Sequence, residues 1–285
     1  MQGASVASVE IERLKNGVQQ KDTDLLAVEE PMEIRLDFGN KSERKSQPIS
    51  VTMRTPGYDF ELALGFLFTE GIIQSPLDVH MIRYCTDMQT IENKNNIVRV
   101  YLNENVIVDT ERLKRNFYTS SSCGVCGKES IESVRTQCKP VAVTNITAAP
   151  EIILGLPATL RKKQNVFEYT GGLHASALFD QKGNLLLLRE DVGRHNALDK
   201  LIGASIFGKE TNIDLSNSIL LLSGRASFEL LQKAAMAGIP IVCAVGAPSS
   251  LAVQIAKTFG ITLIGFLREE RFNIYSGSER IINNG

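Results

Sequence analysis

The sequence predicts a mixed α/β protein whose second half is built on a mostly parallel sheet. Two consecutive strand–helix–strand units near the C-terminus carry this prediction. Their strands are short apolar runs without alternation, which is typical of strands covered on both faces. Units of this kind place their strands parallel, with right-handed crossovers. The strands are expected at 218–222, 240–245 and 262–267, and the helices between them at 228–237 and 251–259.

The first half of the chain has a different pattern, which predicts a smaller α+β domain. Apolar alternation over 25–38 and an extended run over 48–53 indicate two strands. An apolar helix is expected over 60–70, where Gly71 ends it. Short antiparallel strands should follow at 79–86, 96–102 and 106–108. The residues before 25 are polar and weakly periodic, so we expect a loose N-terminal arm.

The middle of the chain links these two patterns. A helix is predicted over 157–165, and another over 196–206. Between them, strands at 174–180 and 185–190 should form a hairpin around Gln181-Lys-Gly-Asn. The chain is therefore expected to divide into a loose arm over 1–24, an α+β domain over 25–118, a mobile loop over 119–127 and a larger α/β domain over 128–278.

Composition limits the possible functions. The 285 residues are 43% hydrophobic and carry a formal net charge of -1, so no basic excess indicates nucleic-acid binding. No apolar stretch reaches the roughly 18 residues that a membrane span needs. The first residues lack the apolar region of a signal peptide. We therefore expect a cytoplasmic protein that does not enter the membrane.

The mobile loop contains Cys123 and Cys126, set between three serines and a Gly-Lys pair. Two thiols at this spacing can form a disulfide, hold a metal ion, or carry sulfur as a persulfide. The following residues, 128–134, can form a helix, and the amino end of a helix favours the nucleophilic thiolate. All three chemistries are compatible with the motif alone.

The rest of the sequence bears on this choice. Five cysteines in a large cytosolic chain argue against a disulfide framework. A zinc site needs about four ligands, and only Cys85 and Cys138 offer poorly spaced partners. A thioredoxin-like CxxC should follow a strand early in a βαβ unit, whereas this one lies in a polar loop at mid-chain. Its position suits a sulfur-carrying arm, and no metal is predicted.

Two polar clusters are candidate anion sites. The first is Glu190-Asp-Val-Gly-Arg-His-Asn-Ala-Leu-Asp-Lys, in which Arg194 and His195 follow a glycine at a strand-to-helix junction. The second follows the last parallel strand, where Arg268 and Arg271 could meet phosphates and Phe266 could stack on a base. Small-residue loops at 223–227 and 246–250 open onto helix amino ends, which suit anions. Helix capping and a solvated charged face are the competing interpretations.

Together these segments resemble the FdhD/NarQ family, the sulfur carriers needed to make active formate dehydrogenase. The similarity runs from about residue 25 to residue 278. It rests on the segments Met53-Arg-Thr-Pro-Gly, Leu62-Ala-Leu-Gly-Phe-Leu-Phe-Thr-Glu-Gly-Ile-Ile, Asn116-Phe-Tyr-Thr-Ser-Ser-Ser-Cys-Gly-Val-Cys-Gly-Lys, Gly171-Gly-Leu-His-Ala-Ser-Ala, Glu190 to Lys200, Leu222-Ser-Gly-Arg-Ala-Ser and Arg271-Phe-Asn-Ile-Tyr.

The resemblance implies a sulfurtransferase. Such a protein takes sulfur from a cysteine desulfurase as a persulfide and passes it to a molybdenum cofactor, bis-molybdopterin guanine dinucleotide, before formate dehydrogenase receives that cofactor. Cys123 corresponds to the persulfide-bearing residue and Cys126 to its helper. The residues that correspond to the guanine-dinucleotide site, where a guanine nucleotide would also bind, are Phe266, Leu267, Arg268, Glu269, Glu270 and Arg271.

The resemblance also implies a cytidine-deaminase-like fold for the larger domain, without the zinc site, and a homodimer. Two other functions remain open on the sequence. One is a chaperone that binds the cofactor without transferring sulfur, and the other is a zinc or redox protein that uses the CxxC.

Overall fold

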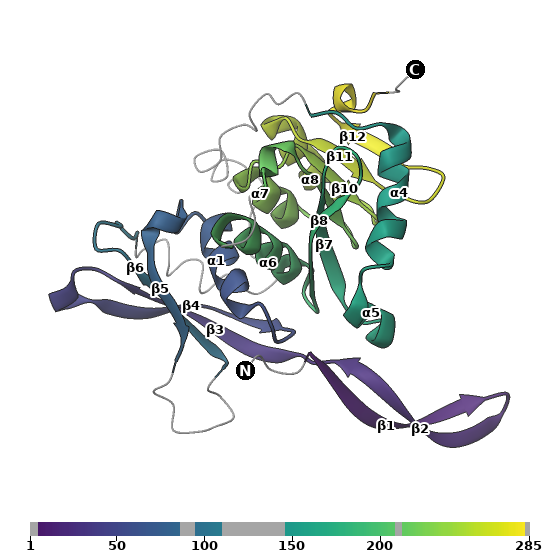
Figure 1. Cartoon of the computed structure of the whole chain (residues 1–285), viewed down its shortest axis with the longest axis horizontal. Helices are drawn as coiled ribbons and strands as arrows, with labels where there is room; N and C mark the ends of the chain where they lie inside the picture. The colour runs from purple at the N-terminus through teal and green to yellow at the C-terminus, as the bar shows by residue number, and fades with distance from the viewer. Residues whose placement is uncertain (1–4, 86–94, 110–145, 209–212, 283–285) are drawn as a thin grey trace.

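The structure is a computed structural model, and it describes residues 5–85, 95–109, 146–208 and 213–282. Their strands form a two-stranded, a four-stranded and a six-stranded sheet. Figure 1 shows the two larger sheets on either side of two helices, α1 (Asp59–Thr69) and α6 (Arg194–Phe207). The mixed α/β class predicted from the sequence is confirmed.

The N-terminal residues are an ordered hairpin in place of the expected loose arm over 1–24. Strands β1 (Val6–Lys15) and β2 (Val18–Ala27) pair antiparallel along their whole length. Asn16 and Gly17 both have positive φ, as a two-residue hairpin turn requires. The hairpin projects from the body of the molecule (Figure 1). This Asn-Gly pair was the signal for the hairpin, and its strands are almost wholly exposed, so no buried apolar face marked them.

The four-stranded sheet has the order β4-β3-β6-β5. Its strands are β3 (Glu30–Phe38), β4 (Lys45–Arg54), β5 (Val79–Tyr84) and β6 (Ile97–Leu102). Alternate residues such as Met32, Ile34 and Val98 are fully buried against α1, so one face of the sheet forms the core of the smaller domain. Residues 106–108 are not a strand.

The six-stranded sheet has the order β12-β11-β10-β9-β7-β8. Its strands are β7 (His174–Phe179), β8 (Leu185–Asp191), β9 (Ile219–Leu222), β10 (Ile241–Ala244), β11 (Thr262–Gly265) and β12 (Asn273–Ser276). The parallel pairing is confined to β9, β10 and β11, whereas β7, β8 and β12 pair antiparallel. The sheet is therefore mixed, with the predicted βαβ units at its centre.

Helices cover both faces of this sheet. On one face pack α6, α7 (Phe228–Met236) and α8 (Ser250–Phe259), and on the other packs α4 (Pro150–Arg161), followed by the short α5 (Asn165–Thr170). Helix α4 therefore begins and ends earlier in the chain than the helix predicted over 157–165. In the described parts of the chain, no helix is both long and apolar enough to cross a membrane.

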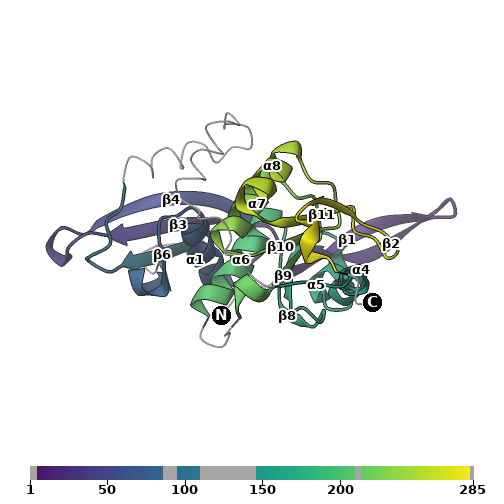
Figure 2. The ribbon, with the colours of Figure 1, turned by 90° about the horizontal axis from the view of Figure 1, so that it is seen from above.

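Helices α1 and α6 join the two domains at a very close crossing. Figure 2 shows α6 between α1 and the strands of the larger sheet. At the crossing Gly65 faces Gly203, and a Cβ on either would collide with backbone of the other helix. A Cβ on Gly65 would meet the carbonyl oxygen of Asp199, and one on Gly203 would meet that of Glu61. Only glycine allows the helices to approach so closely.

Candidate functional site

The CxxC pair lies outside the described residues, as do the predicted loop over 119–127 and the domain boundary at residue 118. Cys85 and Cys243 are free and buried. Burial strongly raises the pKa of the Cys243 thiol, so this side chain is no candidate for a thiolate nucleophile. Within the described residues, no group of three or more metal-binding side chains is present.

The carboxyl ends of β9, β10 and β11 form one edge of the larger sheet, and three loops lie side by side along it. The Gly246 N–H donates to the Gly224 carbonyl at 2.8 Å, and the Phe266 N–H donates to the Gly246 carbonyl at 3.0 Å. Helices α7 and α8 begin at the same edge. The edge therefore combines backbone N–H groups and positive helix ends, which together suit an anion.

Antiparallel pairing brings further side chains to this edge. His174 opens β7 and lies opposite Asp191 at the end of β8. A Cβ on Gly224 would lie 3.3 Å from the His174 Nδ1 atom, so the histidine borders the loop after β9. Arg194 and His195 stand at the amino end of α6. The His195 Nε2 atom lies 3.4 Å from the Ser227 hydroxyl and 3.8 Å from a Glu229 carboxylate oxygen.

At this edge Arg194 is the group that could bind a negatively charged ligand, since the lowered pKa values of His174 and Glu229 favour a neutral ring and an ionised carboxylate. Burial, followed by the positive charge of Arg194, lowers the pKa of His174. The neighbouring His195 ring lowers the pKa of Glu229 to about 2. The buried Nε atom of Arg194 has no hydrogen-bond partner among the described residues, although buried donors are nearly always paired. An anionic group bound beside these helix amino ends could accept a hydrogen bond from this guanidinium N–H.

The predicted 266–271 segment continues this edge. Phe266 is 44% exposed and has φ of 51°, a conformation that a bulky residue rarely adopts without a functional reason. The Arg268 N–H bonds the Arg271 carbonyl at 2.9 Å, which closes the segment into a tight turn. Leu267 is fully buried and belongs to the core, so it cannot contact a ligand through its side chain. The four remaining residues, Arg268, Glu269, Glu270 and Arg271, are exposed.

Most of the Glu190–Lys200 cluster holds the two domains together. Asp191 and Lys200 are buried and 2.6 Å apart. The Lys200 ammonium donates to the Thr55 carbonyl at 2.8 Å, and the Asn196 amide donates to the Met53 carbonyl at 2.7 Å. The interpretation of the cluster as a solvated charged face is therefore wrong for Asp191, Asn196 and Lys200. Of this cluster, only Arg194 and His195 remain candidates for the anion site. Removing either buried charge would leave the other unpaired.

Sequence reasoning did not identify His174 and Glu229 as residues of this edge, whereas Ser227 lies in the 223–227 loop that was a candidate. Pairing of β7 with β8 and β9 brings His174 there, and Glu229 lies in the first turn of α7. The glycine pair before His174 was the available signal, since glycines often accompany a close approach of backbone to a ligand.

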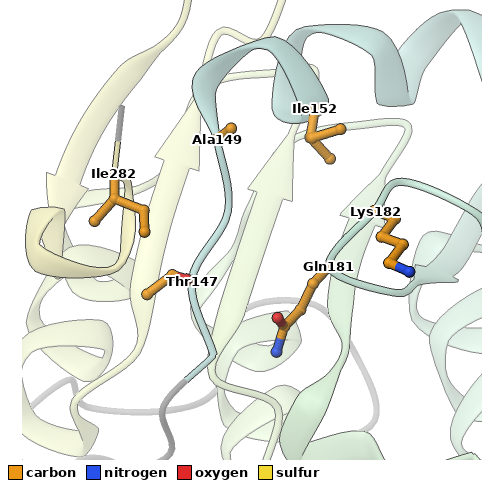
Figure 3. A pocket seen from close by; sticks show the side chains of 6 residues that line it. All are labelled: Thr147, Ala149, Ile152, Gln181, Lys182 and Ile282. Atoms are coloured by element: carbon orange, nitrogen blue, oxygen red, sulfur yellow. The ribbon is translucent and has the colours of Figure 1, made fainter. Parts of the chain in front are cut away.

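A hollow lies at the opposite edge of the sheet, beside the β7–β8 turn. Figure 3 shows its lining side chains, which come from the start of α4, that turn and the C-terminal end. Its volume is about 270 Å³, and Lys182 is its single charged lining residue. Ligand pockets usually exceed this volume and hold several converging polar groups. The edge that carries His174 is therefore the better candidate site.

The family model that matches this chain is that of the FdhD/NarQ family, over residues 27–282. The chain belongs to this family. Its relatives include the sulfur carrier protein FdhD of Streptomyces coelicolor, 48% identical over 273 residues that cover 94% of this chain and 93% of the relative. The protein of the same name from Saccharolobus solfataricus is 42% identical over 279 residues, with 98% and 99% coverage.

A solved structure extends the likeness of this FdhD/NarQ chain to the fold. It is the crystal structure of a protein from Desulfotalea psychrophila that is assigned as a formate dehydrogenase accessory protein. The two structures have a TM-score of 0.73 and 25% sequence identity, with 98% of this chain and 100% of the other covered. The family assignment made from the sequence motifs is thus confirmed, as is the α/β class.

The state of His174 can be measured directly in this FdhD/NarQ chain. Its pKa is lowered, so the ring should be neutral at pH 7 and titrate below pH 6.5 by NMR. An Arg194→Gln variant should move that midpoint upward, because it removes a nearby positive charge. Arg280→Gln, beyond the opposite end of the sheet, should leave it in place. A His174 midpoint at or above 6.5 in the wild type would contradict this description.

Proposed function

We propose that this FdhD/NarQ chain is a sulfur carrier that sulfurates the molybdenum cofactor destined for formate dehydrogenase. The observation that carries the proposal is the family match over 27–282, together with relatives named as sulfur carriers. The anion-binding edge and the CxxC motif supply the two chemical functions that such a carrier needs. The cofactor, bis-molybdopterin guanine dinucleotide, is here a substrate.

Sulfur transfer would proceed by thiolate attack. The Cys123 thiolate attacks the terminal sulfur of a persulfide on a cysteine desulfurase, the donor's S–S bond breaks, and the donor cysteine leaves as a thiolate. In the second step the Cys126 thiolate attacks the Cys123 sulfur, which breaks the persulfide bond and releases sulfide to the metal. The resulting Cys123–Cys126 disulfide is reduced by a thiol before the next cycle. This transfer makes the protein a sulfurtransferase.

The edge of the larger sheet would hold the guanine dinucleotide. Phe266 offers an exposed ring on which guanine can stack, in a conformation that the Arg268–Arg271 turn fixes. The amino ends of α7 and α8, with Arg194 and Arg225, would receive the phosphates. Leu267 would serve only by anchoring Phe266 in the core. Glu269 and Glu270 would face the solvent side of the segment.

The same proposal covers the protein's partners. A cysteine desulfurase would donate sulfur and formate dehydrogenase would receive the finished cofactor, both in the cytoplasm. We also propose that the protein acts as a homodimer. Neither nucleic acid nor a membrane has a part in this function.

Nucleotide binding tests the cofactor site separately from sulfur chemistry. Guanosine diphosphate should bind the full chain, and Phe266→Ala should weaken binding about tenfold, since stacking of one base contributes roughly 1–3 kcal/mol. Phe266→Tyr retains a ring and should bind nearly as the wild type does. Ile107→Ala changes an exposed residue after β6 and is the control. Calorimetric titration that finds equal affinity for Phe266→Ala would exclude this residue from the site.

The sulfur-carrier step is tested by mass. Purified protein incubated with a cysteine desulfurase and cysteine should gain one sulfur atom on the peptide that contains Cys123, and a reductant should remove it. Stoichiometric zinc, or a Cys123–Cys126 disulfide with no sulfur gain, would instead support the metal or redox alternative.

A further inference from the structure

Three arginines form a row across the face of the four-stranded sheet that points away from α1. Arg35 of β3 lies directly beside Arg99 of β6, and Arg99 lies directly beside Arg83 of β5. Neighbouring strands are only about 4.8 Å apart. Like charges placed directly opposite on neighbouring strands are destabilising. Repulsion between these arginines therefore opposes folding unless other groups offset it, and local conflicts of this kind are expected where a surface has a function.

A tyrosine fixes the row and adds a fourth arginine. Arg83, Arg99 and Arg44 place their guanidinium carbons 5.2, 5.3 and 5.9 Å from the centre of the Tyr101 ring. Arg83 donates to the Tyr101 hydroxyl through Nε at 3.1 Å and Nη2 at 2.7 Å. The guanidinium groups are therefore held in place before any ligand arrives, which lowers the entropic cost of binding.

Among the residues that the structure describes, carboxylates form ion pairs with two of the four arginines. The Arg99 guanidinium forms an ion pair with Asp37 at 2.6 Å, and Arg35 forms one with Glu33, also at 2.6 Å. Arg83 has the uncharged Tyr101 hydroxyl as its hydrogen-bond partner, and Arg44 has the Leu102 carbonyl. These two ion pairs show that carboxylates can bind the arginines of this face at hydrogen-bonding distance.

The surroundings of the row indicate a polypeptide ligand. An exposed apolar side chain lies near Arg83 on the same strand: Met81 of β5 is 42% exposed. It offers contact area to a peptide and none to a phosphate backbone. The net charge of -1 for the whole chain also disfavours a nucleic-acid partner. Because β5 is the outermost strand of this sheet in the described part of the chain, a peptide strand can be added beside Arg83.

We propose that the arginine row is a docking site for an extended acidic segment of a partner protein. The segment pairs as an additional strand along the outer edge of β5. One of its carboxylates then lies beside Arg83, so that the row of arginines ends in an opposite charge. Alternate side chains of an extended chain point to one face, so a segment with acidic residues at every second position fits best. This site is separate from the anion-binding edge and does not depend on sulfur transfer.

The test uses a fluorescein-labelled peptide of alternating Glu and Thr and measures its anisotropy with the full-length protein. We expect saturable binding that weakens as salt rises to about 0.5 M, and no binding of the matching Lys and Thr peptide. Arg83→Glu should weaken binding about tenfold or more, because it replaces attraction by repulsion. Arg161→Glu, an equal charge change at an exposed position of α4, should leave binding unchanged.

Several results would overturn the docking site. These are equal binding by Arg83→Glu and the wild type, an equal loss in Arg161→Glu, or tighter binding of a labelled DNA duplex than of the acidic peptide. Thermal unfolding of Arg83→Glu should match the wild type, since the side chain is exposed. Should that variant unfold, Arg83→Gln removes the charge more gently, and unchanged peptide affinity in it would equally reject the proposal.

Discussion

A Cys123→Ala variant should lose sulfur transfer completely while the protein keeps its fold and its affinity for guanosine diphosphate. The substitution removes the atom that forms the S–S bond with the donated sulfur, and no other described cysteine can replace it, because Cys85 and Cys243 are buried. Formate dehydrogenase activity in cells that carry only this variant should fall to background. The measurement is enzyme activity in cell extracts, together with circular dichroism of the purified variant.

Two further results separate the possible roles of the CxxC. Cys126→Ala keeps the sulfur-accepting thiol, so it should still gain sulfur on Cys123 but deliver it more slowly. A protein that only binds the cofactor would tolerate Cys123→Ala, and normal formate dehydrogenase activity in that variant would reject sulfur transfer. Loss of guanosine diphosphate binding in Cys123→Ala would instead mean that the change had damaged the fold.

Adding a single methyl group at the helix crossing should have the largest effect on stability. In Gly65→Ala or Gly203→Ala the new Cβ meets backbone atoms of the other helix, which cannot move aside as a flexible side chain can. Overpacking of this kind costs typically 1–3 kcal/mol, and occasionally more where backbone must shift. We expect a loss of about 3 kcal/mol in the free energy of unfolding, measured by urea denaturation.

Gly155→Ala is the matched control for this prediction. Gly155 lies within α4, and a Cβ there would have no neighbour within 4 Å. Alanine in a helix interior is favoured over glycine by roughly 0.8–1.0 kcal/mol. The control should therefore be slightly more stable than the wild type. If Gly65→Ala were equally well tolerated, the two helices could not lie as close as described.

The parts of the fold with clear periodicity could be predicted from the sequence. The central strands β9, β10 and β11 lie within the predicted ranges, because buried parallel strands and amphipathic helices leave distinct patterns. The N-terminal hairpin could not be recognised from a buried apolar face, since its strands are almost wholly exposed. Helix α4 was misplaced because Pro157 suggested a first turn, whereas Pro150 occupies that position.

The candidate site was less predictable, for a physical reason. Asp191 and Lys200 are charged residues that sequence patterns assign to the surface, yet both are buried, because they pair with each other and with the backbone of Thr55, 136 and 145 residues away along the chain. Likewise, only the antiparallel pairing of β7 with β8 and β9 brings His174 to the anion-binding edge. Pairings between distant segments leave no local signal.

Helix α6 has a consequence for how sequences of this kind can change over generations. One end of it faces the anion-binding edge through Arg194 and His195, its middle crosses α1 at Gly203, and Lys200 ties it to the first domain. Selection for ligand binding and selection for folding therefore act on neighbouring turns of the same helix. We expect α6 to vary least among descendants of a common ancestor, with each invariant position there kept for a different reason.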